Sequence, residues 1–105
     1  MKIEQLVPPL ADCQNIPAGS FPDSAFVWHR YNRKDTWGIA RRGLPGEIIP
    51  APTLAEIMEK LPHGVKCQKV TNYFVVIVGF DYSTVEYDAN PASAALRMWL
   101  KIKRN

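Results

Sequence analysis

Basic and aromatic residues are interleaved between positions 28 and 42 of the chain. The sequence reads WHRYNRKDTW from 28 to 37, and two arginines follow at 41 and 42. In surfaces that bind single-stranded nucleic acid, cations hold the phosphates while aromatic rings stack on the bases. The residues that could make such contacts, or contacts with a protein partner, are Arg30, Tyr31, Arg33, Lys34, Arg41 and Arg42.

The same stretch also fits an ordinary β-hairpin. Alternation along a strand would send Phe26, Trp28 and Arg30 to one face. It would send Val27, His29 and Tyr31 to the other. The tryptophans would then belong to the core, and the arginines would simply be solvated. The pattern therefore leaves three interpretations open, namely packing alone, contact with a protein and contact with nucleic acid.

The cysteines and histidines show no arrangement typical of a metal site. Cys13 and Cys67 are far apart in sequence, as are His29 and His63, and no pair matches a metal-ligand spacing. We therefore predict neither a metal nor a cofactor. Because nothing in the sequence indicates export, we expect both cysteines to be reduced thiols.

Three carboxylates, Asp81, Glu86 and Asp88, are close together in sequence. Two carboxylates in different environments can act as an acid and base pair. Asp81 and Asp88, however, occupy expected turn positions, which aspartate favours through its local hydrogen bonds. We accordingly predict that the protein is not an enzyme.

Proline and glycine divide the chain into elements. We expect residues 1–22 to form an extended arm and Arg42–Pro52 to form a loop. Between them, Ala25–Tyr31 and Thr36–Arg41 predict a β-hairpin with a polar turn at Asn32–Asp35. The basic and aromatic residues would lie on this hairpin.

Two helices can be located from their first residues. Thr53, followed three residues later by Glu56, forms a capping-box pattern that predicts a short helix over Leu54–Leu61. Asn90 and Pro91 are typical of a helix cap and a first helical residue, and they predict a last helix. We expect its tryptophan to anchor it on the sheet. Its apolar stripe consists of Ala92, Ala95, Leu96, Trp99 and Ile102.

Three strands are expected between the helices, over Val65–Thr71, Tyr73–Phe80 and Thr84–Tyr87, joined as an antiparallel meander. The middle strand is apolar at both odd and even positions, which indicates that both of its faces are covered. Two helices on one face would leave the other face open. We therefore expect the N-terminal hairpin or a second copy of the chain to cover it, so a homodimer is one of the predicted forms.

The complete prediction is an α+β fold, in which an antiparallel sheet and an N-terminal hairpin follow the order β-β-α-β-β-β-α, with two helices packed on one sheet face. The 105 residues have the size of one domain, and we assign 1–105 to it. The longest apolar run is too short to cross a bilayer. The N-terminus lacks the apolar segment of a secretory signal, so we expect a cytoplasmic protein without membrane contact.

The net charge of +3 is concentrated at one end of the chain. Four of the 13 basic residues lie near the C-terminus, namely Arg97, Lys101, Lys103 and Arg104. Cations there complement the negative end of a helix dipole. The rest of the chain carries nine basic and ten acidic groups, so the charge gives little indication of a nucleic-acid partner.

The α-β-β-β-α order from Thr53 to Lys103 is similar to that of double-stranded-RNA-binding domains. In that family, the second helix begins with a lysine cluster that faces phosphates, whereas residues 90–95 read NPASAA and contain no cation. This departure argues against the activity, because phosphate neutralisation supplies most of the affinity.

A second resemblance is carried by PAPTLAE at 50–56 with Leu61-Pro62 after it, and by NPA at 90–92 leading into LRMWLK at 96–101. These segments, which cover about half of the chain, resemble small uncharacterised proteins encoded by bacteriophages and prophages of bacteria. The resemblance implies a viral or mobile-element origin and no particular activity. We therefore predict a non-enzymatic accessory or interaction protein. The alternative is a nucleic-acid-binding module that uses residues 28–42.

Overall fold

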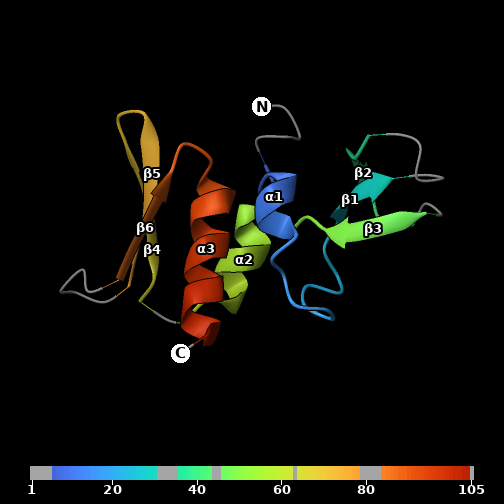
Figure 1. The fold of residues 1–105 in the computed structure, drawn as a ribbon. Coiled ribbons are helices and arrows are strands. Elements are labelled where there is room, and N and C mark those ends of the chain that lie inside the picture. The colour runs from blue at the N-terminus through green and yellow to red at the C-terminus, as the bar shows by residue number, and fades with distance from the viewer. Residues whose placement is uncertain (1–5, 31–35, 44–45, 63, 79–83, 105) are drawn as a thin grey trace.

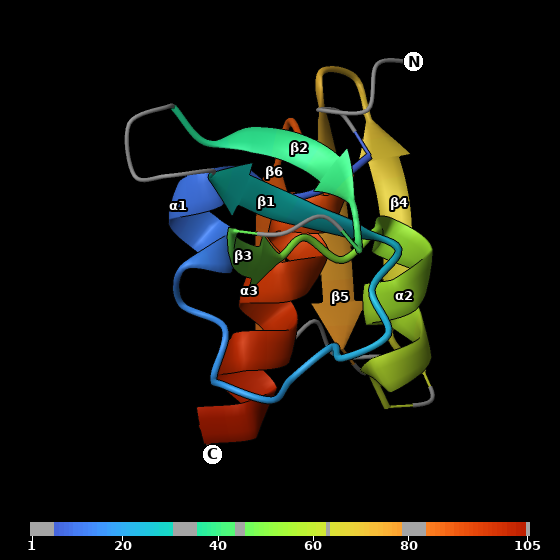
Figure 2. The same ribbon diagram turned by 90° about the vertical axis from the view of Figure 1, so that its right-hand side faces the viewer.

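The last helix, α3 (Pro91–Arg104), lies between two antiparallel sheets in the computed structural model. The structure describes residues 6–30, 36–43, 46–62, 64–78 and 84–104. Figure 1 shows a middle layer formed by α3, α2 (Leu54–Lys60) and α1 (Leu10–Cys13), with one sheet on each side of it. Figure 2 confirms the layers, because one sheet lies in front of the helices and the other behind them.

The N-terminal sheet has the order β2-β1-β3, and the C-terminal sheet has the order β4-β5-β6. The strands of the first are β1 (Phe26–Arg30), β2 (Gly38–Arg41) and β3 (Glu47–Pro50). The strands of the second are β4 (Lys66–Val70), β5 (Tyr73–Val78) and β6 (Thr84–Asp88). All neighbouring strands are antiparallel, so the predicted α+β class, hairpin and meander are confirmed.

Strand β3 lies where the sequence predicts a loop. Its four residues are bounded by Gly46 and end at Pro50, a composition that is typical of a turn. Pairing with the central strand β1 makes the segment extended, since Trp28 of β1 lies opposite Ile49 of β3 and Ile39 of β2. The side chains of these three residues pack against the core.

The arm at the N-terminus also contains more structure than its prolines predict. Helix α1 follows Pro9, whose carbonyl oxygen accepts two backbone hydrogen bonds of 3.1 Å from this single turn. The indole Nε1 of Trp28 donates to the carbonyl oxygen of Pro8 at 3.1 Å. The arm is therefore fixed to the N-terminal sheet instead of running freely over the surface.

Both predicted helix starts are confirmed. The Thr53 Oγ1 accepts from the Glu56 backbone N–H at 3.3 Å, and Glu56 Oε1 accepts from the Thr53 N–H at 2.8 Å. Asn90 Oδ1 accepts from two backbone N–H groups in the first turn of α3, at 2.9 and 3.2 Å. Its Nδ2 also donates to the Val7 carbonyl at 2.9 Å, which joins the helix start to the arm.

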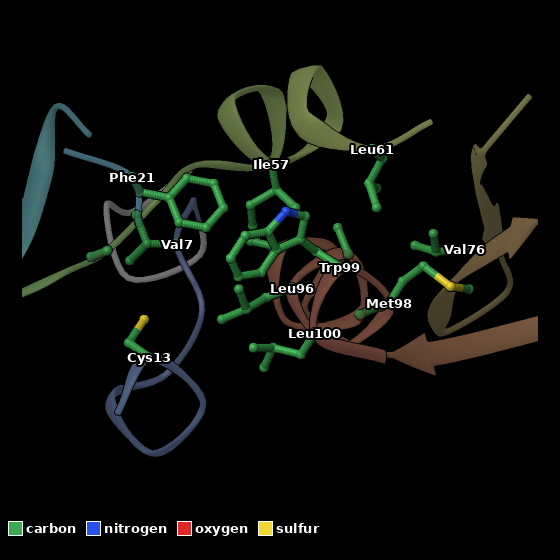
Figure 3. Close-up of a cluster of buried hydrophobic side chains, with 14 residues drawn as sticks. Val7, Cys13, Phe21, Ile57, Leu61, Val76, Leu96, Met98, Trp99 and Leu100 are labelled. Carbon is green, nitrogen blue, oxygen red and sulfur yellow. The ribbon is translucent and has the colours of Figure 1, made fainter. Parts of the chain in front are cut away.

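Helix α3 is buried on more sides than its predicted stripe requires. Ala94, Met98 and Leu100 are buried in addition to four residues of the stripe. Figure 3 shows Trp99 beside Phe21 and Ile57, whereas Met98 points toward Val76 of β5. The rings of Trp99 and Phe21 are 4.8 Å apart between centroids. Trp99 therefore anchors α3 to the arm and α2, and not to the sheet as the sequence predicts.

Replacing Trp99 by alanine should lower the free energy of unfolding by about 3–5 kcal/mol, because a buried aromatic ring leaves a cavity. Denaturant titration measures this change. Ile48→Ala is the control, since Ile48 is an apolar residue with 42% of its surface exposed, and it should cost less than about 1 kcal/mol. Equal losses in the two variants would show that Trp99 does not hold the layers together.

Candidate interaction surface

The basic and aromatic residues of positions 28–42 are partly used in internal contacts. The Arg30 Nη2 donates to Glu47 Oε2 at 2.8 Å, and the Arg30 Cζ lies 4.8 Å from the centroid of the Trp37 ring. Because Glu47 belongs to β3, this ion pair joins the central strand to its neighbour. Trp28 packs against the core, as the first of the three interpretations requires.

Arg42 holds the turn that leads into β1. Its Nε donates to the Ser24 carbonyl at 2.9 Å, and its Nη2 donates to Ser24 Oγ at 2.7 Å and to the Phe21 carbonyl at 3.3 Å. The turn needs such support because Phe21 has a φ of 52°, a region that bulky residues rarely adopt. Glu56 adds a contact from α2, since its Oε2 accepts from the Ala25 N–H at 3.1 Å.

Among the described residues, Arg30 and Arg42 are the candidate contacts with an internal role. Arg41 is exposed at the end of β2. Tyr31, Arg33 and Lys34 lie outside the described residues. Within the part of the chain that the structure describes, the six residues therefore do not form one basic and aromatic surface.

A small hollow lies beside the turn that Arg42 supports. It has a volume of about 130 Å³ and is lined by residues 21–24 together with Glu56, Glu59 and Lys60 of α2. Ligand sites are usually larger, with volumes of about 300–1,000 Å³. Both oxygens of the Glu56 carboxylate are already used by backbone N–H groups. The hollow is therefore a poor candidate for a substrate or cofactor site.

The carboxylates considered for acid and base chemistry connect β6 to α3. Arg97 Nη2 donates to Asp88 Oδ2 at 2.7 Å, and Lys101 Nζ lies 2.9 Å from Glu86 Oε1. Asp81 is outside the described residues. The two described carboxylates thus serve as ion-pair partners of the helix.

Both cysteines are free thiols, and Cys13 is buried. Burial raises the pKa of the Cys13 thiol to about 12, and it raises the pKa of the Cys67 thiol as well. Within the described ranges, no three histidine, cysteine or acidic side chains are grouped so that they could hold a metal ion. The described helices include none that is long and apolar enough to cross a membrane.

One face of the C-terminal sheet points away from the helices. Cys67, Val76 and Glu86 are paired across the three strands, and Val76 is fully buried on the helix side. The alternating positions belong to the opposite face. We call this face the outer sheet face, and its positions are Lys66, Gln68, Val70, Tyr73, Val75, Ile77, Val85 and Tyr87.

Most positions of the outer sheet face have apolar residue types. Tyr87 is 66% exposed, more than any other large hydrophobic residue with a described side chain. Lys66 and Gln68 are exposed along β4, and no position of the face is acidic. In Figure 1, every described helix and the N-terminal sheet lie on the other side of β4-β5-β6. The expectation that the hairpin covers this face is therefore wrong, and cover by a second copy stays a prediction.

The apolar pattern on both sides of β5 predicts this face from the sequence, but it does not identify Tyr87. Tyr87 becomes recognisable only when the register places it opposite Val75, in the same row as Gln68. Comparison of the chain with protein-family models, with curated proteins and with solved structures finds no match in any of the three. The geometry of the chain is therefore the basis for any functional argument.

Arg42→Ala should lower the free energy of unfolding by about 1–3 kcal/mol, because hydrogen bonds of a charged group to two carbonyls and a hydroxyl are lost. Arg41→Ala is the matched control at the preceding residue, which is exposed, and it should change stability by less than about 0.5 kcal/mol. Denaturant titration of both variants checks this. If both arginines cost the same, the turn does not depend on Arg42.

Stability should also fall in alkaline solution through Cys13. The pKa of Cys13 is raised in the folded state, so folding favours the neutral thiol. The stability that this preference contributes is fully present below the ordinary pKa of 9.0. It is lost as the pH rises from 9.0 toward 12. The stability of the wild type relative to Cys13→Ala should therefore drop by about 1–2 kcal/mol between pH 8 and about pH 10.5. If the difference in stability between the wild type and Cys13→Ala stays constant over this pH range, burial does not raise the pKa of Cys13.

Proposed function

We propose that this protein is a non-enzymatic interaction module that binds a protein partner through the outer sheet face. The observation that carries the proposal is the exposure of Tyr87, at 66%, on a sheet face whose other positions are mostly apolar. Large contiguous apolar patches are rare on the surface of monomeric proteins and mark interaction sites. Tyrosine is also among the residues enriched in protein interfaces.

Two further observations support a binding role over a catalytic one. The carboxylates of β6 are ion-paired with α3, and the hollow beside α2 is small for a ligand site. The segments at 50–56 and 90–101 that resemble small phage and prophage proteins support an accessory role in such an element. We therefore propose a phage or prophage accessory protein that acts by binding.

The alternative is a nucleic-acid-binding module that uses residues 28–42. It is supported by Arg41, which is exposed at the end of β2. It is weakened by Arg30 and Arg42, whose guanidinium groups are used in contacts with Glu47 and with the Phe21–Ser24 turn. If it were correct, single-stranded oligonucleotides would bind with an affinity that falls as salt rises, and Arg41→Ala would flatten that slope.

An uncharged fluorescent apolar dye, Nile red, tests the proposed face directly. At about 1 μM protein, the folded wild type should enhance the fluorescence of the dye. Tyr87→Lys should reduce this enhancement several-fold, because it places a charge within the apolar face. Ile48→Lys places the same charge at the other exposed apolar position, on β3, and should have little effect. Equal enhancement by the wild type and Tyr87→Lys would rule out the outer sheet face as the site.

A further inference from the structure

We infer that the open edge of β4 binds an extended acidic segment of another protein, which joins the C-terminal sheet as an added strand. The inference rests on the proposed function, because alternate side chains of the added strand would lie beside the outer sheet face, and it names the chemistry of the partner. It follows from the backbone groups that β4 leaves unpaired and from the charge along this strand.

The hydrogen-bond pattern directs part of the β4 backbone outward. β4 is one of the two edge strands of its sheet (Figure 2). Its turn into β5 has two residues, so Val70 and Tyr73 form a hydrogen-bonded pair. Because hydrogen-bonded and non-hydrogen-bonded pairs alternate along an antiparallel ladder, the N–H and C=O groups of Cys67 and Lys69 point away from β5. Among the described residues, none forms a hydrogen bond with these outward groups.

The other three sheet edges are less suited to an added strand. The edge of β6 is occupied, because the Tyr87 carbonyl accepts from Arg97 Nη2 at 2.8 Å. The edge of β3 ends at Pro50, which has no N–H to donate. Strand β2 has four residues, and its Gly38 and Ala40 offer little side-chain surface for cross-strand contacts. The five residues of β4 therefore form the most complete template for pairing.

The charge along β4 selects an acidic partner. Lys66, Gln68 and Lys69 are exposed, and the strand contains no acidic residue. Neither lysine forms an ion pair with a described residue. Lysines on an open edge oppose pairing with a strand of the same charge, whereas opposite charges on neighbouring strands attract. The edge thus disfavours a second copy of β4 and favours an acidic strand.

The register determines where the acidic residues must stand. Lys66 and Lys69 are three positions apart, so their side chains belong to opposite faces of the sheet. An antiparallel added strand therefore needs two acidic residues three positions apart, with β-forming residues around them. The probe is a capped hexapeptide that reads threonine, glutamate, threonine, valine, glutamate, threonine. Its glutamates lie opposite the two lysines, and its valine lies opposite Cys67.

Solvent exchange of backbone amides, followed by NMR on the full chain, tests the pairing. In the free protein, the N–H groups of Cys67 and Lys69 should exchange fast, and those of Gln68 and Val70, which face β5, should exchange slowly. About 5 mM peptide should slow the exchange at Cys67 and Lys69 about fivefold, as expected for a Kd on the order of 1 mM. A peptide with lysine in place of both glutamates should cause no slowing.

Two methylated peptides separate strand pairing from charge attraction. A methyl group on the backbone nitrogen of the valine removes the donor that faces the Cys67 carbonyl, and it should abolish the slowing. The same methyl group on the third residue, a threonine whose N–H points away from β4, should change the Kd by less than about threefold. Equal binding of the two methylated peptides would overturn the added strand.

A charge reversal on the protein tests the selection of an acidic partner. Lys66→Glu combined with Lys69→Glu should raise the Kd of the acidic peptide by about tenfold or more, and the lysine peptide should then bind. Arg41→Glu reverses an exposed cation at the edge of the other sheet and should leave the Kd unchanged. If Arg41→Glu weakens binding as much as the double variant, the peptide does not use β4, and the inference is overturned. Circular dichroism shows whether the variants are folded.

The added strand and the proposed function fail in different ways. If about 5 mM acidic peptide leaves the exchange of Cys67 and Lys69 unchanged, the added strand is overturned, whereas the outer sheet face is still decided by Nile red and Tyr87→Lys. If the peptide slows this exchange but the dye does not distinguish the wild type from Tyr87→Lys, β4 binds the strand and the proposed face is wrong.

Discussion

Helix α3 has to be buried on two opposite sides at once, and most of the structure follows from that requirement. Neither three-stranded sheet has a second sheet layer directly against it, so each depends on the helices for its apolar cover. The alanines at 92, 94 and 95 let neighbouring elements approach closely, while Trp99 and Met98 fill the spaces toward α2 and toward β5. One continuous core therefore extends from Val7 in the arm to Leu100.

Polar contacts set the positions of the layers around this apolar core. Asn90 joins the start of α3 to the arm, and Ser93 Oγ donates to the Asp12 carboxylate of α1. Arg42 and Glu56 both hold the turn before β1, from β2 and from α2 respectively. Apolar packing is nondirectional, whereas these hydrogen bonds join particular atoms, so they restrict how the layers can slide against one another.

The parts of the structure that the sequence predicts are those determined by neighbouring residues. A capping box needs only Thr53 and Glu56, three residues apart, and the start of α3 needs only Asn90 and Pro91. Strand β3 forms because β1 lies beside it, and its composition contains no sign of that distant partner. The sequence alone indicates that Arg42 is a surface cation, because the carbonyls that it binds lie about 20 residues earlier in the chain. The outer sheet face was partly predictable, because β5 is apolar on both sides.

Tyr87 contacts helix α3 through its backbone, whereas most of its side chain is exposed. The carbonyl oxygen of Tyr87 accepts a hydrogen bond of 2.8 Å from Arg97 Nη2 of α3, while the side chain is directed to the outer face. The strand that presents the ring is therefore attached to the most deeply buried helix of the molecule. Arg97 thereby fixes the backbone of the residue that presents the ring, so a contact made by the ring would cost little ordering of β6.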